Sequence, residues 1–307
     1  DYTTAVNEFQ QVIDQNSRLA ESYRAEGIAY YSEKAYPEAI AAFSRSLNNM
    51  DDPDKEFKKD VQFYLAQARM DYGEVDKAIE VYSEILKAGE DEQAFFLRGK
   101  AYISMEDYKN AEKDFQRALE GCEDYNLYIN IYQIYVDHNK AVDGDAYLKM
   151  ALELEPQDGE DCYHRGRIYE YEKNYEAARD ELKTAMEQGY EDAMLLLGRV
   201  YLEMEDPASA RSMYQEYLQK SEQGAKAYNG LAMCDIYDGA YDSALENIAQ
   251  GLKENSKEDE QGLLYNEIVA YEYKRDFATA KEKMKIYLEQ YPEDEAALRE
   301  NEFLSTR

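Results

Sequence analysis

The chain has 307 residues, of which 44% are hydrophobic and 33% are charged, so it carries enough apolar material for a continuous core. Asp and Glu number 66 against 35 Lys and Arg, which gives a formal net charge of -31. So acidic a surface repels the phosphates of nucleic acids and anionic lipid headgroups, and we expect neither as a partner. No run of about 18 apolar residues is present, so we expect no membrane insertion by this segment.

A pattern of small and aromatic residues returns about every 34 residues along the whole chain, as in arrays of helix pairs. Each unit has a small residue and a tyrosine on its first predicted helix, then an alanine on its second. These second-helix alanines are Ala39, Ala78, Ala111, Ala178, Ala210, Ala244 and Ala280, and Gly144 occupies the skipped position.

This register predicts one solenoid over residues 1–307. Residues 1–19 are the second half of an incomplete unit, residues 20–292 form eight helix pairs, and residues 293–307 form a polar capping helix. The predicted pairs begin near Ala20, Lys59, Glu92, Tyr125, Gly159, Glu191, Ala225 and Gln261.

The small residues and the prolines both have a place in this plan. Small residues such as Gly27, Gly99 and Gly198 allow the two helices of a pair to approach closely, which a larger side chain would prevent. Pro37 and Pro207 fall in the first turn of a predicted second helix, where the missing N–H costs little. The other prolines, Pro53, Pro156 and Pro292, follow predicted helix ends.

These residues resemble the tetratricopeptide repeat family over nearly the whole chain. The last unit shows the resemblance best, with Tyr271, Asp276, Phe277, Ala280, Tyr287 and Pro292 at the expected offsets. The resemblance implies an all-α fold, an α-solenoid superhelix of stacked antiparallel helix pairs. It also implies a concave groove lined by the first helix of each pair.

Two places depart from the family pattern. The fourth unit has Tyr132 where a small residue is usual and Gly144 where alanine is usual, so we expect an altered unit rather than a missing one. The junction 51–60 carries about five extra residues relative to a repeat of this kind, which predicts a longer loop or an extended helix.

The sequence offers no reaction centre. It contains none of the motifs for a nucleophile elbow, a zinc protease, a phosphate-binding loop or a dinucleotide fold, and only two histidines. Three scattered cysteines predict neither a disulfide framework nor a structural zinc site, and Cys162 and Cys234 fall within helices as buried apolar side chains. We therefore expect no enzyme, no catalytic residues, no metal and no cofactor.

The groove is the better candidate for a binding site. In the family, the residue after the small one faces the groove, and this position is basic or an amide in the middle of the chain. Neighbouring first-helix positions add further polar groups. The candidate ligand-binding residues are Lys100, Asn130, Gln133, Tyr163, His164, Arg167, Arg199, Asn229 and Asn266.

Two interpretations of these residues stay open. In the first, their basic side chains receive carboxylates of an acidic or extended peptide while the amides pair with its backbone. In the second, each basic residue only balances a nearby carboxylate such as Glu170 or Glu203. The predicted function is accordingly a non-catalytic protein-binding scaffold or adaptor, and a purely structural role through the outer face is an alternative.

The 31 tyrosines suggest a further alternative, a glycan or small-ligand binding module. Most recur at core offsets, where packing explains them. The better placed for the groove are Tyr31, Tyr64, Tyr171, Tyr237 and Tyr273. Sugar platforms favour tryptophan, and this chain has none.

The cellular location and the oligomeric state stay open. Unpaired cysteines are compatible with the cytoplasm. A start without Met inside a repeat is compatible with a processed piece of a longer protein, and of the two locations we favour a bacterial surface lipoprotein.

Overall fold

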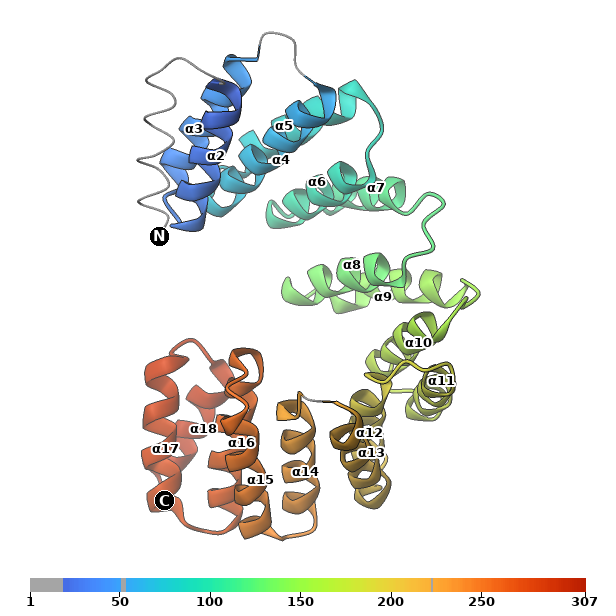
Figure 1. Ribbon diagram of the computed structural model, residues 1–307, viewed down its shortest axis with the longest axis vertical. Coiled ribbons are helices and arrows are strands. Elements are labelled where there is room, and N and C mark those ends of the chain that lie inside the picture. The colour runs from blue at the N-terminus through green and yellow to red at the C-terminus, as the bar shows by residue number, and fades with distance from the viewer. Residues whose placement is uncertain (1–18, 51–53, 222) are drawn as a thin grey trace. The chain divides into compact units, whose positions relative to one another are not determined.

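The computed structural model describes residues 19–50, 54–221 and 223–307. Regular structure in these residues is helical throughout and comprises seventeen helices, α2 to α18 (Figure 1). The predicted all-α fold of stacked antiparallel helix pairs is confirmed. The half unit predicted for residues 1–19 lies outside the described residues except for Leu19, which begins α2.

The chain divides into two compact units, Asp1–Met150 and Ala151–Arg307. The helices of unit 1 are α2 (Leu19–Ser32), α3 (Tyr36–Asn48), α4 (Lys55–Tyr72), α5 (Val75–Ala88), α6 (Glu92–Ser104), α7 (Tyr108–Ala118), α8 (Tyr125–Asp137) and α9 (Ala141–Leu152), whose last two residues fall in unit 2. The helices of unit 2 are α10 (Gly159–Tyr171), α11 (Tyr175–Glu187), α12 (Ala193–Glu203), α13 (Pro207–Lys220), α14 (Ala225–Tyr237), α15 (Tyr241–Lys253), α16 (Lys257–Tyr273), α17 (Phe277–Gln290) and α18 (Glu295–Ser305). The prediction of one continuous solenoid stays a prediction.

The predicted register holds helix by helix. Seven first helices begin within four residues of the predicted position, and α2 begins one residue before it. The predicted capping helix is α18, and the extended helix predicted at the first junction is the 18-residue α4. Pro37 and Pro207 lie in the first turns of α3 and α13, as predicted. Pro53 lies outside the described residues.

The turn between the two helices of a pair has the same backbone conformation in every repeat. One residue in each of the eight turns has a left-handed backbone, with φ between 57° and 88°. Six of the eight are not glycine, so the tight turn is imposed by the packing of the pair and not by a flexible residue. These residues are Lys34, Gly73, Glu106, Asn139, Lys173, Glu205, Gly239 and Arg275.

The small residues have the role that the sequence predicted. A Cβ placed on Gly27 would lie 2.6 Å from the ring of Phe43 on the paired helix, and a Cβ on Gly99 would lie 2.7 Å from Phe115. In the fourth unit the sizes are exchanged, because Gly144 makes room for the ring of Tyr132. That unit is altered but present, as expected.

Many of the carboxylates serve the helix ends. Aspartates accept hydrogen bonds from first-turn N–H groups, which satisfies donors that have no partner inside the helix. The aspartate N-caps are Asp54, Asp91, Asp107, Asp124, Asp158, Asp206, Asp276 and Asp294. Part of the large negative charge therefore serves to cap helices.

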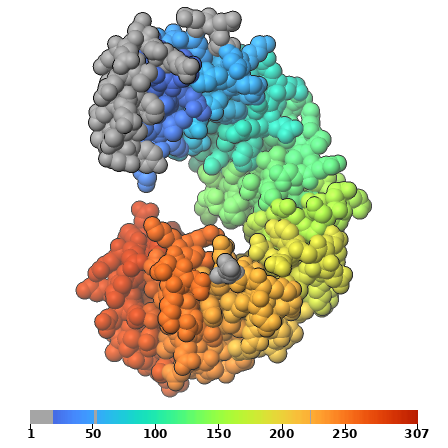
Figure 2. Space-filling model, in the orientation of Figure 1, coloured from blue at the N-terminus to red at the C-terminus, as the bar shows by residue number. Residues whose placement is uncertain are grey.

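In unit 2 the first helices form one face of the stack. Helix α10 contacts α12, α12 contacts α14, and α14 contacts α16, while α11, α13, α15 and α17 pack behind them. In the space-filling view, side chains fill the gaps that the ribbon leaves between neighbouring helices of this unit (Figure 2). The core includes the predicted buried thiols of Cys162 and Cys234.

Candidate functional site

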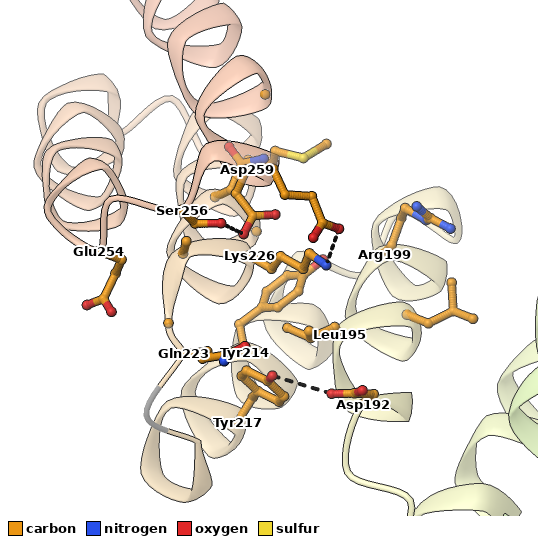
Figure 3. A pocket seen from close by; sticks show the side chains of 18 of the residues that line it. Asp192, Leu195, Arg199, Tyr214, Tyr217, Gln223, Lys226, Glu254, Ser256 and Asp259 are labelled. Atoms are coloured by element: carbon orange, nitrogen blue, oxygen red, sulfur yellow. Dashed lines mark hydrogen bonds and ion pairs between the residues drawn. The ribbon is translucent and has the colours of Figure 1, made fainter. Parts of the chain in front are cut away.

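A cavity of about 760 Å³ lies within unit 2, on the face formed by the first helices (Figure 3). Its walls come from α12, from α14 as far as Met233, from the N-terminal part of α16, and from side chains of α13. Tyr163 of α10 also lines it, so four consecutive repeats contribute to one site. Neither histidine nor cysteine lines it among the described residues.

Tyr214 forms part of the cavity wall although it belongs to a second helix. It occupies the core position four residues after Ala210 in α13, and only 4% of it is exposed. A Cβ on Gly198 would lie 2.6 Å from the end of its ring, and a Cβ on Gly230 would lie closer still. The two glycines thus open a gap between α12 and α14 through which the ring reaches the cavity.

The hydroxyl of Tyr214 has no hydrogen-bond partner among the described residues. Burial raises its pKa, so the group stays a neutral phenol that can both donate and accept a hydrogen bond. Its neighbour Tyr217 is also buried, and its hydroxyl donates to Asp192 Oδ1 at 3.4 Å (Figure 3).

Two ion pairs fix the cations at the cavity. The Lys226 ammonium on α14 donates to Glu258 Oε1 on α16 at 2.9 Å, which raises the pKa of Lys226 and lowers that of Glu258. The Arg199 guanidinium donates to both oxygens of Glu170, at 2.5 and 2.6 Å. Burial lowers the pKa of Arg199, but the hydrogen bonds and charge of Glu170 outweigh it and raise the pKa overall.

Three carboxylates at the cavity have no such partner. Asp192, Glu254 and Asp259 line it, and none of them forms an ion pair with a described residue. Asp259 accepts a hydrogen bond from Ser256 Oγ at 2.6 Å, which still leaves its second oxygen available. The charged groups of the wall are thus two paired cations and four carboxylates.

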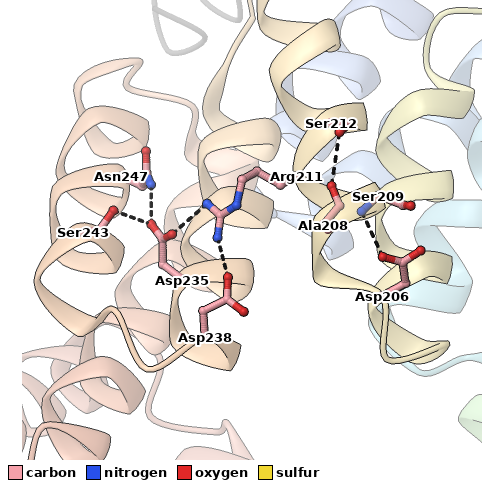
Figure 4. A network of polar contacts seen from close by, with 9 residues as sticks. All are labelled: Asp206, Ala208, Ser209, Arg211, Ser212, Asp235, Asp238, Ser243 and Asn247. Atoms are coloured by element: carbon pink, nitrogen blue, oxygen red, sulfur yellow. Dashed lines mark hydrogen bonds and ion pairs between the residues drawn. The ribbon is translucent and has the colours of Figure 1, made fainter.

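Helix α14 is held in place from behind by a buried carboxylate. Asp235 is 3% exposed and accepts hydrogen bonds at 2.7 Å from Arg211 of α13 and from Ser243 and Asn247 of α15 (Figure 4). Arg211 also pairs with Asp238 at 2.9 Å. Since charge-assisted hydrogen bonds are short and directional, this network orients the helix that carries Asn229, Gly230 and Met233 to the cavity.

The structure brings three of the nine sequence-predicted residues to this cavity, namely Tyr163, Arg199 and Asn229. Asn266 does not line the cavity, but it donates to Asn229 Oδ1 at 2.8 Å and so orients that amide. Arg167 lies over the Tyr163 ring at 5.9 Å and 3.3 Å from His164 Nδ1. His164 is only 5% exposed, so little of its side chain is available to a ligand.

The remaining three predicted residues, Lys100, Asn130 and Gln133, belong to unit 1. All three are exposed on first helices, and Gln133 donates to Asp137 at 2.8 Å. The pairing of Arg199 with Glu170 matches the charge-balance interpretation for that residue.

Sequence reasoning missed Lys226, Tyr214 and the carboxylates around them. It followed the groove position after each small residue and a few neighbouring first-helix positions, whereas Lys226 lies in a first turn and Tyr214 at a core position of a second helix. One signal was present in the sequence. Gly230 adds a second small residue two positions before Ala232, where the repeat does not require one.

Of the five tyrosines predicted to face the groove, three are exposed and two are engaged with other side chains. Tyr171, Tyr237 and Tyr273 are exposed at the ends of first helices, with Tyr273 stacked on Tyr241 at 6.0 Å. Tyr31 donates to Asp71, and Tyr64 stacks on Phe43 at 5.5 Å, so both are engaged inside unit 1.

Family models described as tetratricopeptide repeat match residues 1–54, 92–124, 163–225 and 195–260, which together span more than half of the chain. The chain belongs to the tetratricopeptide repeat family. No curated protein matches it, and none of the family matches indicates a lipoprotein.

Two solved structures with TM-scores above 0.5 agree with this fold. Yeast Tom70 has a TM-score of 0.54 and 15% identity, covering 94% of this chain and 74% of that chain. A tetratricopeptide repeat protein from Parabacteroides merdae has a TM-score of 0.52 and 12% identity, covering 82% and 100%. YrrB, described as a TPR protein with an unusual peptide-binding site, is 26% identical with a TM-score of 0.40, covering 61% and 97%.

Within the described residues of this tetratricopeptide repeat protein, none of the helices combines the length and the apolar character needed to cross a bilayer. Nor do three or more His, Cys, Asp or Glu side chains come together there in a metal-binding arrangement.

Proposed function

We propose that this chain is a non-catalytic scaffold that binds a partner protein through an extended peptide segment, and that the cavity of unit 2 receives that segment. The observation that carries the proposal is the cavity itself, about 760 Å³ in volume and lined by the first helices of four consecutive repeats. Tetratricopeptide repeat domains generally act as protein-binding scaffolds, which supports a peptide over other ligands.

The cavity has the parts that an extended peptide needs. The Asn229 amide, oriented by Asn266, offers a donor and an acceptor to a peptide backbone. Met233 is 41% exposed and gives the wall an adaptable apolar patch. The rings of Tyr163, Tyr214 and Tyr217 supply contact area with few rotatable bonds, which limits the entropy lost on binding.

The test is to fill the cavity without disturbing the helices. Gly262 is exposed in α16 and lines the cavity, and a Cβ there would meet only the Asn229 amide, at an ordinary 3.4 Å. Gly262→Phe therefore places a ring in the cavity and replaces a poor helix former. Ser212→Phe adds the same ring at an exposed position of α13 that does not line the cavity.

Binding is measured on a displayed library of random peptides and, in parallel, on a glycan array. We expect enrichment of peptides by the unmodified chain and by Ser212→Phe, and loss of this enrichment with Gly262→Phe. Equal peptide binding by both variants would remove the cavity from the proposal. Glycan binding without peptide enrichment would favour the glycan alternative instead.

A further inference from the structure

We infer that the cavity of unit 2 recognises a basic side chain, lysine or arginine, on the bound peptide. This inference rests on the proposed function and names the chemistry of its partner. It differs from the acidic peptide that one interpretation of the sequence proposed, because the cations of the site are already engaged.

The first step is the state of those cations. Arg199 gives both ends of its guanidinium to Glu170, and the Lys226 ammonium is bound to Glu258. A carboxylate of the ligand would have to displace the Glu170 or Glu258 carboxylate or lie close to it. Two carboxylates in close contact repel each other, so an acidic side chain gains little binding energy here.

The second step is the state of the anions. Asp192, Glu254 and Asp259 line the same cavity and form no ion pair within the described part of the chain. Asp192 and Asp259 lie at the starts of α12 and α16, so the cavity mouth has carboxylates from two repeats. A guanidinium or ammonium that enters between them finds opposite charge without breaking an existing pair.

The third step is the hydroxyl of Tyr214. Tyr214 is 4% exposed, lines the cavity, and has no hydrogen-bond partner among the described residues. The ring is buried, but the hydroxyl oxygen is not one of the buried atoms without a partner, so a group that enters the cavity can reach it. Its oxygen can accept from an N–H of arginine or lysine, and its ring can lie beside the cation.

One substitution should change the affinity for basic and for acidic ligands in opposite directions. Lys226→Gln removes a cation from the wall and releases the Glu258 carboxylate. A basic ligand should then bind more tightly, and an acidic ligand less tightly. Asp192→Asn combined with Asp259→Asn removes two of the unpaired charges while keeping the acceptor oxygens of both side chains.

The experiment uses the full chain and pools of labelled peptides of about nine residues, which extend to roughly 30 Å. Other positions hold Ser, Asn, Leu and Tyr, and the centre is fixed as Arg, Lys, Gln or Glu. Fluorescence anisotropy should rank Arg and Lys above Gln, with Glu weakest and about tenfold below Arg, or about 1.4 kcal/mol. Thermal melting of each variant checks that it is folded.

Two further results complete the expected outcome. The double Asn variant should bring Arg-centred binding down to the level of Gln, and Lys226→Gln should raise Arg-centred binding about threefold by removing a nearby like charge. Raising the salt concentration should weaken Arg-centred binding, since these carboxylates are partly exposed.

The remaining outcomes overturn one claim or both. One outcome is that the pools bind and that Gly262→Phe abolishes this binding, but that Glu is preferred at the centre or no preference is found. This would overturn the inference of a basic side chain, while the proposed function stands. A decrease in Arg-centred binding with Lys226→Gln would also overturn it. If no pool binds in a way that Gly262→Phe abolishes, both the inference and the proposed function fall.

Discussion

Tyr82 in unit 1 and Tyr214 in unit 2 occupy the same repeat position, four residues after the alanine of a second helix, yet they meet different surroundings. Tyr82 is 1% exposed within the core of unit 1, close to the hydrogen-bonded pair Tyr31 and Asp71. Tyr214 lies between two glycines and reaches a cavity.

The difference shows how a repeat can change from packing to binding with few substitutions. The second helix keeps its aromatic residue in both places. What changes is the first helix of the following repeat, where Gly230 removes the side chain that would otherwise meet the ring. The same contrast holds for Phe115 in unit 1, which is enclosed by Tyr135 and Tyr147 at 6.1 and 6.0 Å.

The largest expected effect is the loss of stability when the buried aspartate of an ion-pair network is removed, and each unit has one such network. Asp235→Ala should lower the free energy of unfolding by about 3–5 kcal/mol, because it leaves the Arg211 guanidinium partly buried and without its main partner. Asp114→Ala should do the same in unit 1, where Asp114 is buried against Arg98. Urea denaturation measures both.

The control for these two variants is Asp238→Ala, since that carboxylate is 47% exposed and its pair with Arg211 is worth little. Peptide binding below the melting transition sharpens the comparison further. It should fall for Asp235→Ala and remain for Asp114→Ala. Loss of binding in both would mean that the binding surface is not confined to unit 2.

The next effect concerns the glycines beside the aromatic rings. Gly230→Ala should destabilise the chain by about 1–3 kcal/mol, because the new methyl group overlaps the Tyr214 ring. Gly262→Ala has open contact distances and should stabilise α16 by up to about 1 kcal/mol. Thermal melting of the two variants gives the sign; stabilisation by Gly230→Ala would contradict the close approach.

Gly99→Ala extends this test to unit 1. A Cβ there would lie 2.7 Å from Phe115, so a comparable loss of stability is expected. Peptide binding should nevertheless stay unchanged, because Gly99 does not line the cavity.

A smaller effect is the pH dependence of stability, which should differ between the two units. Burial, together with the neighbouring Glu300 carboxylate, raises the pKa of Glu272 in α16 from 4.5 to about 7. The folded state therefore holds this proton more tightly than the unfolded state, and stability is lost as the pH rises through about 7. Glu272→Gln should stabilise the chain by about 1 kcal/mol at about pH 8, a value reduced for partial exposure.

The difference between Glu272→Gln and the unmodified chain should vanish as the pH falls below 4.5, where Glu272 becomes protonated in the unfolded state as well as in the folded state. In unit 1, burial also raises the pKa of Glu26, but the Arg45 charge opposes the shift. Glu26→Gln should therefore gain less at high pH. Melting curves across this range test both, and a gain for Glu272→Gln that is independent of pH would exclude titration as the cause.

The smallest expected change compares the two tyrosine hydroxyls themselves. Tyr214→Phe should weaken binding of Arg-centred peptides about fivefold, as expected for the loss of one hydrogen bond. Tyr82→Phe should leave binding unchanged. Neither should lower the melting temperature, because neither hydroxyl has a hydrogen-bond partner among the described residues.

Much of the fold could be predicted from the sequence because the same small, aromatic and alanine positions recur in nearly every repeat. Close approach at Gly27 and Gly99, the prolines in first turns and the second-helix alanines all fix one register. Even the exchange of sizes between Tyr132 and Gly144 could be recognised, since it disturbs that register in one place only.

The site could be predicted only in part, because its chemistry depends on contacts between repeats. Arg199 is correctly placed at the cavity, but nothing in the spacing says that Glu170, 29 positions earlier, occupies its guanidinium. Tyr214 has the offset of a core residue, and its access to the cavity depends on Gly230 in the next repeat. Lys226 faces Glu258 across two helices, which no periodic pattern encodes.

Hydrogen exchange with and without the Arg-centred peptide pool tests the central claim most directly, because it reports on both units in one measurement. Binding in the unit 2 cavity should slow amide exchange at the first turns of α14 and α16, which line it, and leave the helices around Tyr82 unchanged. Slower exchange around Tyr82 in α4 to α6 alone, or no slowing anywhere while peptide is bound, would contradict the assignment of binding to this cavity.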